Sequence, residues 1–116
     1  MPSTTSCRQG DIVLVSFPFT DFSSAKKRPA VVVSPDSYNA RGGDVVLAAI
    51  TSQVSDERHT VIVRAGDYVA GALPTQSMVK LSKLFTIHSD LIIRKLCRLK
   101  PEKRAEVLAA VRDFFQ

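Results

Sequence analysis

The sequence predicts a mainly β domain, a small barrel or sandwich of short strands with one α-helix at its C-terminal end. Short apolar runs rich in β-branched residues alternate with polar loops along most of the chain. After Pro101 the apolar residues recur every three or four positions, which is the spacing of an amphipathic helix. The regular alternation of strands and helices that marks a nucleotide-binding parallel sheet is missing.

Five runs are predicted to be strands because they are apolar, rich in Val and Ile, and bounded by Pro, Gly, Ser or Asp. They are residues 12–17, 30–33, 44–50, 60–63 and 77–81. Residues 85–87 either extend the fifth strand or begin another. Residues 89–99 suit a helix and a strand equally well.

The connections are predicted from polar residues and from Pro and Gly. They comprise a loop from Pro18 into the cations at 26–28, a turn or short helical piece at 34–43, a loop at 52–58, and a loop marked by Gly71 and Pro74. In the second of these, Pro35 suits a first helical position and Ser34 its cap. The final helix has Pro101 in its first turn, but Lys100 is a poor cap. Residues 1–9 are expected to be a flexible tail and residues 10–116 a single domain.

Composition places the chain among globular proteins, and its charge favours an anionic partner. It has 116 residues, 45% hydrophobic and 23% charged, with a net charge of +5 and a sequence pI of about 9.6. This balance favours a nucleic acid or an acidic protein as partner. Cys7 and Cys97 are too few and too far apart for a disulfide framework, so a reducing cytoplasm is expected. We expect no membrane segment and no signal peptide, because the apolar runs are short.

Several kinds of site lack their motif. The sequence contains no GxxxxGK[ST], GxGxxG, HExxH or CxxC, so neither a nucleotide cofactor nor a metal is expected. His59 and His88 have the right chemistry for an acid–base pair in RNA cleavage. Nothing in their spacing places them together, so both are expected to be polar surface residues.

Four segments occur in a distinctive order: GDIVLVSFPFTD, KKRPAVVVSPDSYN, VVLAAITSQ and GALPTQSMVKLSKLFTI. Together with the Leu99–Glu102 stretch before the last helix, this order resembles the MazF/PemK family over about residues 10–112. The resemblance implies a small SH3-like β-barrel of the CcdB/MazF kind, with accessory helices and a C-terminal α-helix, that forms a homodimer. It also implies the toxin of a type II toxin–antitoxin module, with an acidic antitoxin as partner. The expected activity is cleavage of single-stranded RNA without a metal or cofactor.

The family's catalytic residues, an Arg before Pro and a Thr ending a later strand, fall on Arg28 and Thr51. When a ribose 2′-hydroxyl attacks phosphorus, negative charge grows on the phosphate oxygens. A planar guanidinium can bind two of these oxygens at once. The Thr51 hydroxyl can donate a hydrogen bond to the same phosphate. The groups that carry protons stay open, because an arginine pKa above about 12 makes Arg28 a poor base.

Further residues are expected to bind RNA by charge or by hydrogen bonds. They are Lys26, Lys27, Ser23, Ser24, Gln53 and Lys83, with Phe19 or Phe22 as a stacking platform. Lys83 stands where some relatives have Gln, so it is expected to affect base preference. A second basic cluster either widens the RNA groove, docks an antitoxin or is merely solvated; its members are Arg94, Lys95, Arg98, Lys100, Lys103 and Arg104.

Two other functions stay open on sequence grounds. One is a CcdB-like toxin that poisons gyrase by protein contact, and the other is an SH3-like module that binds nucleic acid without cutting it. The pairing of Arg28-Pro29 with Ile50-Thr51 favours the ribonuclease.

Overall fold

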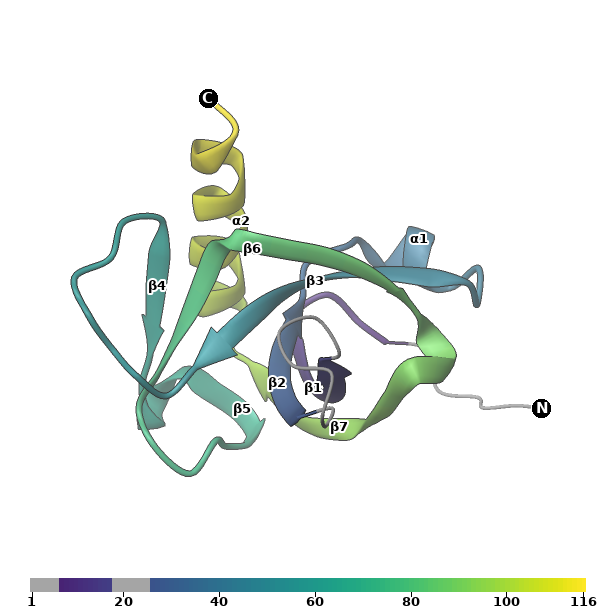
Figure 1. Ribbon diagram of the computed structural model, residues 1–116, viewed down its shortest axis with the longest axis horizontal. Helices are drawn as coiled ribbons and strands as arrows, with labels where there is room; N and C mark the ends of the chain where they lie inside the picture. The colour runs from purple at the N-terminus through teal and green to yellow at the C-terminus, as the bar shows by residue number, and fades with distance from the viewer. Residues whose placement is uncertain (1–6, 18–25) are drawn as a thin grey trace.

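The described part of the chain, residues 7–17 and 26–116 of a computed structural model, folds into one curled antiparallel sheet of seven strands (Figure 1). The strands are β1 (Asp11–Phe17), β2 (Lys26–Val32), β3 (Asp44–Thr51), β4 (Thr60–Val63), β5 (Tyr68–Gly71), β6 (Ser77–His88) and β7 (Ile92–Leu99). Their order across the sheet is β4-β6-β3-β2-β1-β7-β5, and every neighbouring pair is antiparallel. The sheet is thus a half-barrel.

The core lies on both faces of the central strands. In β1, Ile12 belongs to one buried cluster, whereas its neighbour Val13 belongs to a second cluster on the opposite face. Val31 and Val32 of β2 divide between the clusters in the same way. Since successive side chains of a strand point to opposite faces, a strand buried on both sides must be apolar throughout. This explains the continuous apolar runs in the sequence.

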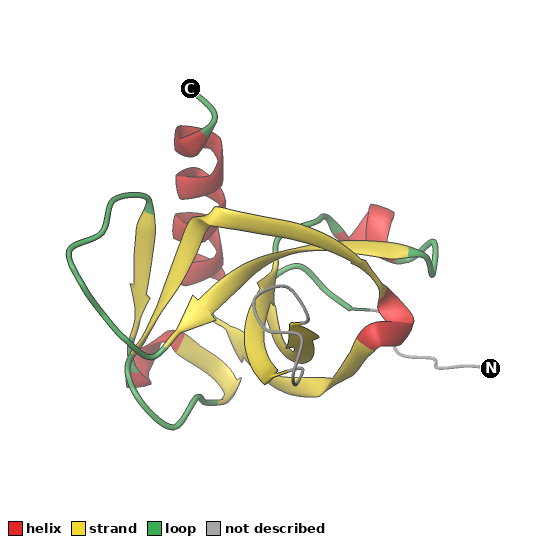
Figure 2. Ribbon diagram, in the orientation of Figure 1, coloured by secondary structure: helices red, strands yellow, loops and turns green. Residues whose placement is uncertain are grey.

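The helix α2 (Pro101–Phe114) covers one of these clusters. Val107 is buried there, and Leu108 and Val111 pack against the same group of residues. Figure 2 shows the helix on one side of the sheet beside β4 and β6. Pro101 occupies the first turn, and Lys100 provides no side-chain cap, as predicted. Packing of the apolar stripe therefore stabilises this helix more than its cap does.

The mainly β fold with a C-terminal helix is confirmed, and the two ambiguous segments are resolved. Residues 85–87 extend the fifth run, because β6 is continuous from Ser77 to His88. Residues 89–99 form a short 3₁₀ helix, η2 (Ser89–Leu91), followed by β7. Residues 81–83 lie in an irregularity of the β3–β6 ladder, between the pairs Ala49–Lys80 and Ala48–Leu84.

Two elements were not predicted. β5 pairs only with β7 at the sheet edge and is largely exposed, so its sequence YVAG carries no strong apolar signal. A 3₁₀ turn, η1 (Ala65–Asp67), leads into it. β2 also begins earlier than predicted, at Lys26, because cations are tolerated where a strand is exposed.

The predicted role of Ser34 as a helix cap is wrong. Pro35 precedes the short helix α1 (Asp36–Asn39), and no side chain caps it. Ser34 is buried, and its hydroxyl donates to Asn39 Oδ1 at 2.5 Å while accepting the Val46 N–H at 3.0 Å. The hydroxyl thus ties α1 to β3.

Part of the expected N-terminal tail is packed against the sheet. Cys7 is buried with the second core cluster, and the Gln9 side chain donates to the Val33 carbonyl at 2.9 Å. Burial raises the pKa of the Cys7 thiol. Both cysteines are free thiols. The prediction of a tail therefore does not hold for residues 7–9, whereas residues 1–6 lie outside the described residues.

Some of the second basic cluster has a structural role. The carboxylate of Asp11, 2% exposed, accepts from Arg98 Nε at 2.8 Å and lies 3.2 Å from Lys95 Nζ. Lys103 Nζ donates to the Ile62 carbonyl at 3.1 Å and lies 2.8 Å from Glu106. These cations join elements of the fold, which leaves them less free to bind an external anion. Within the described residues, no helix is both long and apolar enough to cross a membrane.

Candidate active site between strands β2 and β3

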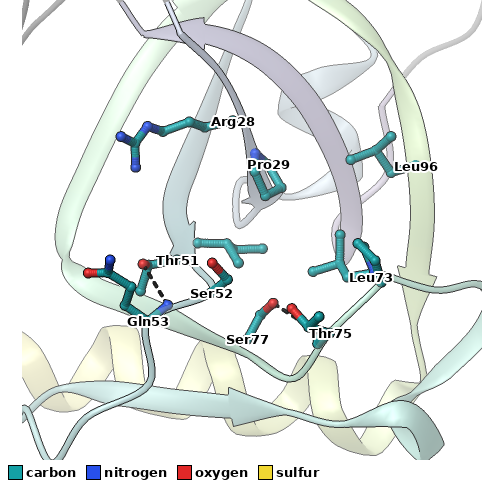
Figure 3. A pocket seen from close by; sticks show the side chains of 11 residues that line it. Arg28, Pro29, Thr51, Ser52, Gln53, Leu73, Thr75, Ser77 and Leu96 are labelled. Atoms are coloured by element: carbon teal, nitrogen blue, oxygen red, sulfur yellow. Dashed lines mark hydrogen bonds between the residues drawn. The ribbon is translucent and has the colours of Figure 1, made fainter.

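An open pocket of about 420 Å³ lies at the ends of β2 and β3 (Figure 3). It is lined by Arg28, Pro29, Ile50, Thr51, Ser52, Gln53, Leu73, Pro74, Thr75, Ser77 and Leu96. These residues come from four strands and two loops that are distant in the sequence. The curl of the sheet brings them together.

The end of the β2–β3 ladder helps to explain why Arg28 and Thr51 share this pocket. The ladder ends at the pair of Ala30 with Ala49, and Arg28 and Thr51 each lie two residues beyond that pair on their own strand. Residues two apart on a strand point to the same face. Arg28 therefore shares a face with Ala30 and Thr51 shares a face with Ala49, and Figure 3 shows both side chains at the pocket.

The Thr51 hydroxyl is held by a local hydrogen bond. Its oxygen accepts the backbone N–H of Gln53 at 3.1 Å (Figure 3). A hydroxyl can accept and donate at the same time, so the Thr51 proton stays available to a bound ligand. The same bond turns the chain after β3 and places Ser52 and Gln53 at the rim.

The pocket carries a single formal charge among its described lining residues. Arg28 provides it, and the other polar groups are hydroxyls and the Gln53 carboxamide. An anion would therefore meet one cation and several neutral donors, with no carboxylate to repel it. No group of three or more His, Cys, Asp or Glu side chains is placed to share a metal ion within the described residues.

The other predicted binding residues fare differently. Gln53 lines the pocket, whereas Lys27 is exposed and does not line it. Lys83 is exposed in the irregular part of β6, also outside the lining. The structure therefore does not bring Lys27 and Lys83 to the pocket. Ser23, Ser24, Phe19, Phe22 and the side chain of Lys26 lie outside what the structure describes.

The two histidines serve separate structural roles. The His59 ring packs edge-on against Phe114 with centroids 5.2 Å apart. His88 Nδ1 accepts the backbone N–H of Asp90 at 3.1 Å, at the start of η2. Neither lines the pocket, in keeping with the expectation that they form no acid–base pair.

Several lining residues were missed by sequence reasoning. Ser52, Thr75 and Ser77 add hydroxyl groups, and Leu73 and Leu96 add apolar surface. The segment GALPTQS was part of the distinctive order, but no site role was predicted for it. Its residue types alone gave no role, because Leu, Pro, Thr and Ser are common in any loop.

The loop that carries Leu73 is fixed at both ends. Before it, Gly71 has φ +66° and lies so close to β7 that an added Cβ would sit 2.7 Å from the Leu96 carbonyl oxygen. After it, the Ser77 hydroxyl donates to the Thr75 carbonyl at 3.0 Å. Burial raises the pKa of Tyr68, and a hydrogen bond with the Leu73 backbone partly opposes the shift. Tyr68 therefore packs beneath this loop.

Solved structures with the same fold are toxins and ribonucleases. MazF from Deinococcus radiodurans has 20% identity and a TM-score of 0.77, with 97% of this chain and 98% of that chain covered. The Mycobacterium tuberculosis toxin MazF-mt6 has 20% identity and a TM-score of 0.73, covering 90% and 95% of the two chains. An endoribonuclease bound to its cognate antitoxin, from a mycobacterial species, has 16% identity and a TM-score of 0.75, covering 97% and 95%. At these identities, the likeness shows the fold.

The sequence itself shows the family. A comparison with curated proteins found no match. Residues 8–115, however, match the family described as the PemK-like, MazF-like toxins of type II toxin–antitoxin systems. That match spans nearly the whole chain and includes every residue that lines the pocket. With the curled sheet and its pocket, it shows that the chain belongs to the PemK-like, MazF-like family of type II toxin–antitoxin toxins.

Proposed function

We propose that this toxin is an endoribonuclease that cuts single-stranded RNA in the pocket between β2 and β3. The observation that carries the proposal is that Arg28 and Thr51 line one pocket, just beyond the last pair of the β2–β3 ladder. Family membership and the endoribonucleases among proteins of the same fold support it. The open shape also suits a flexible single strand, whose phosphates and bases are both accessible.

In the proposed reaction, the 2′-oxygen of a ribose attacks the adjacent phosphorus while the bond to the 5′-oxygen breaks. One proton leaves the 2′-hydroxyl and one reaches the 5′-oxygen, so the products are a 2′,3′-cyclic phosphate and a 5′-hydroxyl. Arg28 stabilises the charge that grows on the phosphate oxygens. Thr51 donates a hydrogen bond to one of those oxygens and keeps its proton, while its own oxygen accepts the Gln53 N–H. No metal or cofactor is required for these roles.

The proposed partners follow from charge and from the relatives. The net charge of +5 favours a polyanionic substrate and an acidic antitoxin. Structures of this fold have been solved with a cognate antitoxin and as the MazE–MazF complex from Deinococcus radiodurans. We infer that this toxin forms a homodimer, acts on messenger RNA in the cytoplasm, and is held inactive by such an antitoxin.

The deciding experiment is cleavage of a labelled single-stranded RNA by the purified protein in excess EDTA. We expect cleavage, and we expect Arg28→Ala to lower the rate by ~100-fold or more, as loss of a preorganised charge does. Arg28→Lys should recover part of the rate, because lysine keeps the charge without the planar fork. Arg41→Ala is the matched control. Arg41 is exposed in the turn before β3, so this substitution removes the same charge outside the pocket.

Intact RNA under these conditions, or equal cleavage by wild type and Arg28→Ala, would refute the proposal. If intact RNA came with tight binding, the toxin would be a non-cleaving module. If it came with bound gyrase, the toxin would act by protein contact. Circular dichroism of each variant establishes that a lost rate is not a lost fold.

A further inference from the structure

We propose that Leu73 and Leu96 form an apolar wall that receives one nucleobase next to the scissile phosphate and so selects the cleavage sequence. The inference rests on the proposed ribonuclease function and adds a specificity role for two residues. It begins from the division of the pocket into two unlike sides. In Figure 3, Arg28, Thr51 and Gln53 lie toward one side, and Leu73 and Leu96 lie toward the other.

The chemistry of a nucleotide assigns each side its occupant. The phosphate is an anion, so it belongs beside the guanidinium of Arg28. The ribose is rich in hydroxyl groups. The base is the part of a nucleotide that has broad faces able to cover apolar surface. A wall of two leucines opposite the charge therefore suits a base attached to the bound phosphate through its ribose.

The size of the pocket limits this occupant to about one nucleotide. Its volume of about 420 Å³ is near the lower end of the range of roughly 300–1,000 Å³ for small-ligand sites. None of the described lining residues is aromatic, so the base packs on aliphatic side chains here. In such an apolar site, the gain or loss of a methylene-sized contact changes discrimination by roughly 10–200-fold. The shape of the wall can thus decide which base is preferred.

The wall is held rigidly before any RNA arrives. Leu73 and Leu96 are partly buried, and each packs against the core cluster beneath the helix α2. The close approach of Gly71 to the Leu96 carbonyl fixes the distance between the loop and β7. The bond from Ser77 to the Thr75 carbonyl fixes the other end of the loop. A preformed surface loses little conformational entropy when a ligand binds, which favours selection by shape.

The test is a double-mutant cycle between a leucine and a base. Cleavage of a randomised RNA pool first gives the preferred sequence. Oligonucleotides of that sequence then carry an abasic ribose at each position around the cut, and kcat/KM is measured with wild type, Leu73→Ala and Leu96→Ala. At one position next to the cut, we expect removal of the base to lower kcat/KM of the wild type by about tenfold or more. The same removal should lower kcat/KM of each variant by less than about threefold, because one of the two leucines that contact the base is already gone.

Three further variants keep the test decisive. Leu91→Ala is the matched control, because Leu91 is 61% exposed in η2 and outside the pocket, so it should behave as wild type. Leu73→Met and Leu96→Met keep the apolar volume and should fold. They are expected to change the ratio of kcat/KM between the preferred base and the other three bases. Urea unfolding reports whether the alanine variants remain folded.

Binding separates failure of the inference from failure of the proposed function. An oligonucleotide with 2′-deoxyribose at the cut cannot react, so its affinity reports base recognition alone. If RNA is cut but removal of the base lowers kcat/KM equally for wild type and both leucine variants, the proposed role of the apolar wall is refuted and the ribonuclease function stands. If RNA stays intact while the binding cycle shows coupling, the ribonuclease fails and base recognition stands. Absence of both cleavage and coupling overturns both.

Discussion

Replacing Gly71 by alanine is expected to destabilise the fold much more than replacing Gly42. Both glycines have positive φ, +66° and +76°, so each substitution places a side chain in the left-handed region. That conformation costs about 1–2 kcal/mol. An added Cβ at Gly42 meets nothing within 4 Å. Gly42→Ala therefore measures the backbone cost by itself.

At Gly71 a steric cost adds to the backbone cost. The new Cβ would lie 2.7 Å from the Leu96 carbonyl oxygen and 3.0 Å from the Cys97 Cβ. Ordinary contact begins at 3.4 Å, so β5 must move by about 0.7 Å (3.4 minus 2.7) from β7. Because β7 is also paired with β1, the edge strand β5 is the side that yields. Forced packing of this kind costs about 1–3 kcal/mol, which brings the total to about 2–5 kcal/mol.

Urea unfolding gives the free energy of unfolding of each variant, and the two values can be compared directly if the m-values are equal. Equal destabilisation by Gly71→Ala and Gly42→Ala would refute the steric argument, and with it the claim that Gly71 sets the spacing of Leu73 and Leu96. Gly71→Ala should also raise KM for RNA while Gly42→Ala leaves it unchanged, because only the former displaces the pocket loop.

Three other substitutions test further features. Thr51→Val should slow RNA cleavage by ~10–1000-fold while Thr51→Ser keeps most of the rate, because one donor to the phosphate is lost or retained; equal single-turnover rates would remove the hydroxyl from the reaction. Ser34→Ala should lower the free energy of unfolding in urea by about 1–3 kcal/mol, since the half-buried Val46 N–H loses its acceptor, whereas Ser37→Ala, at an exposed position, should change it by nothing measurable. Burial raises the pKa of the Cys97 thiol from 9.0 to about 11, so the folded state keeps a proton that the unfolded chain releases in that window. Stability should therefore fall as pH rises from 9 toward 11, and Cys97→Ala should make the fall shallower by up to about 1.4 kcal/mol per pH unit; parallel curves for the two proteins would contradict this.

The sequence was informative where burial was strong. Runs such as Val31–Val33 and Val45–Ile50 are buried on both faces of the sheet, so they had to be apolar and were easy to recognise. β5 was not predicted, because an edge strand needs little apolar surface and its course depends on the close approach of Gly71 to β7. Ser34 was misassigned because local rules favour a cap, whereas tertiary packing draws its hydroxyl to Val46.

The candidate site was half predictable. Arg28 and Thr51 came from the family resemblance, and both line the pocket just beyond the end of the β2–β3 ladder. Leu96 could not be predicted from the sequence, because its place in the pocket depends on how β7 curls back toward the loop before β6. Lys27 was chosen for its charge and Lys83 because some relatives have Gln there, and neither reason says which face of a strand a side chain occupies.

Within the described residues, the ladder between β2 and β3 stops at the pair of Ala30 with Ala49, while β2 stays paired with β1 and β3 with β6 past that point. The pocket therefore lies at a fork in the sheet, where the main-chain groups of β2 and β3 no longer pair with each other. Replacing a side chain by alanine leaves every main-chain amide and carbonyl in place. An alanine scan will accordingly understate what this fork contributes to affinity, and a variant lacking both Arg28 and Thr51 should still hold RNA weakly without cutting it.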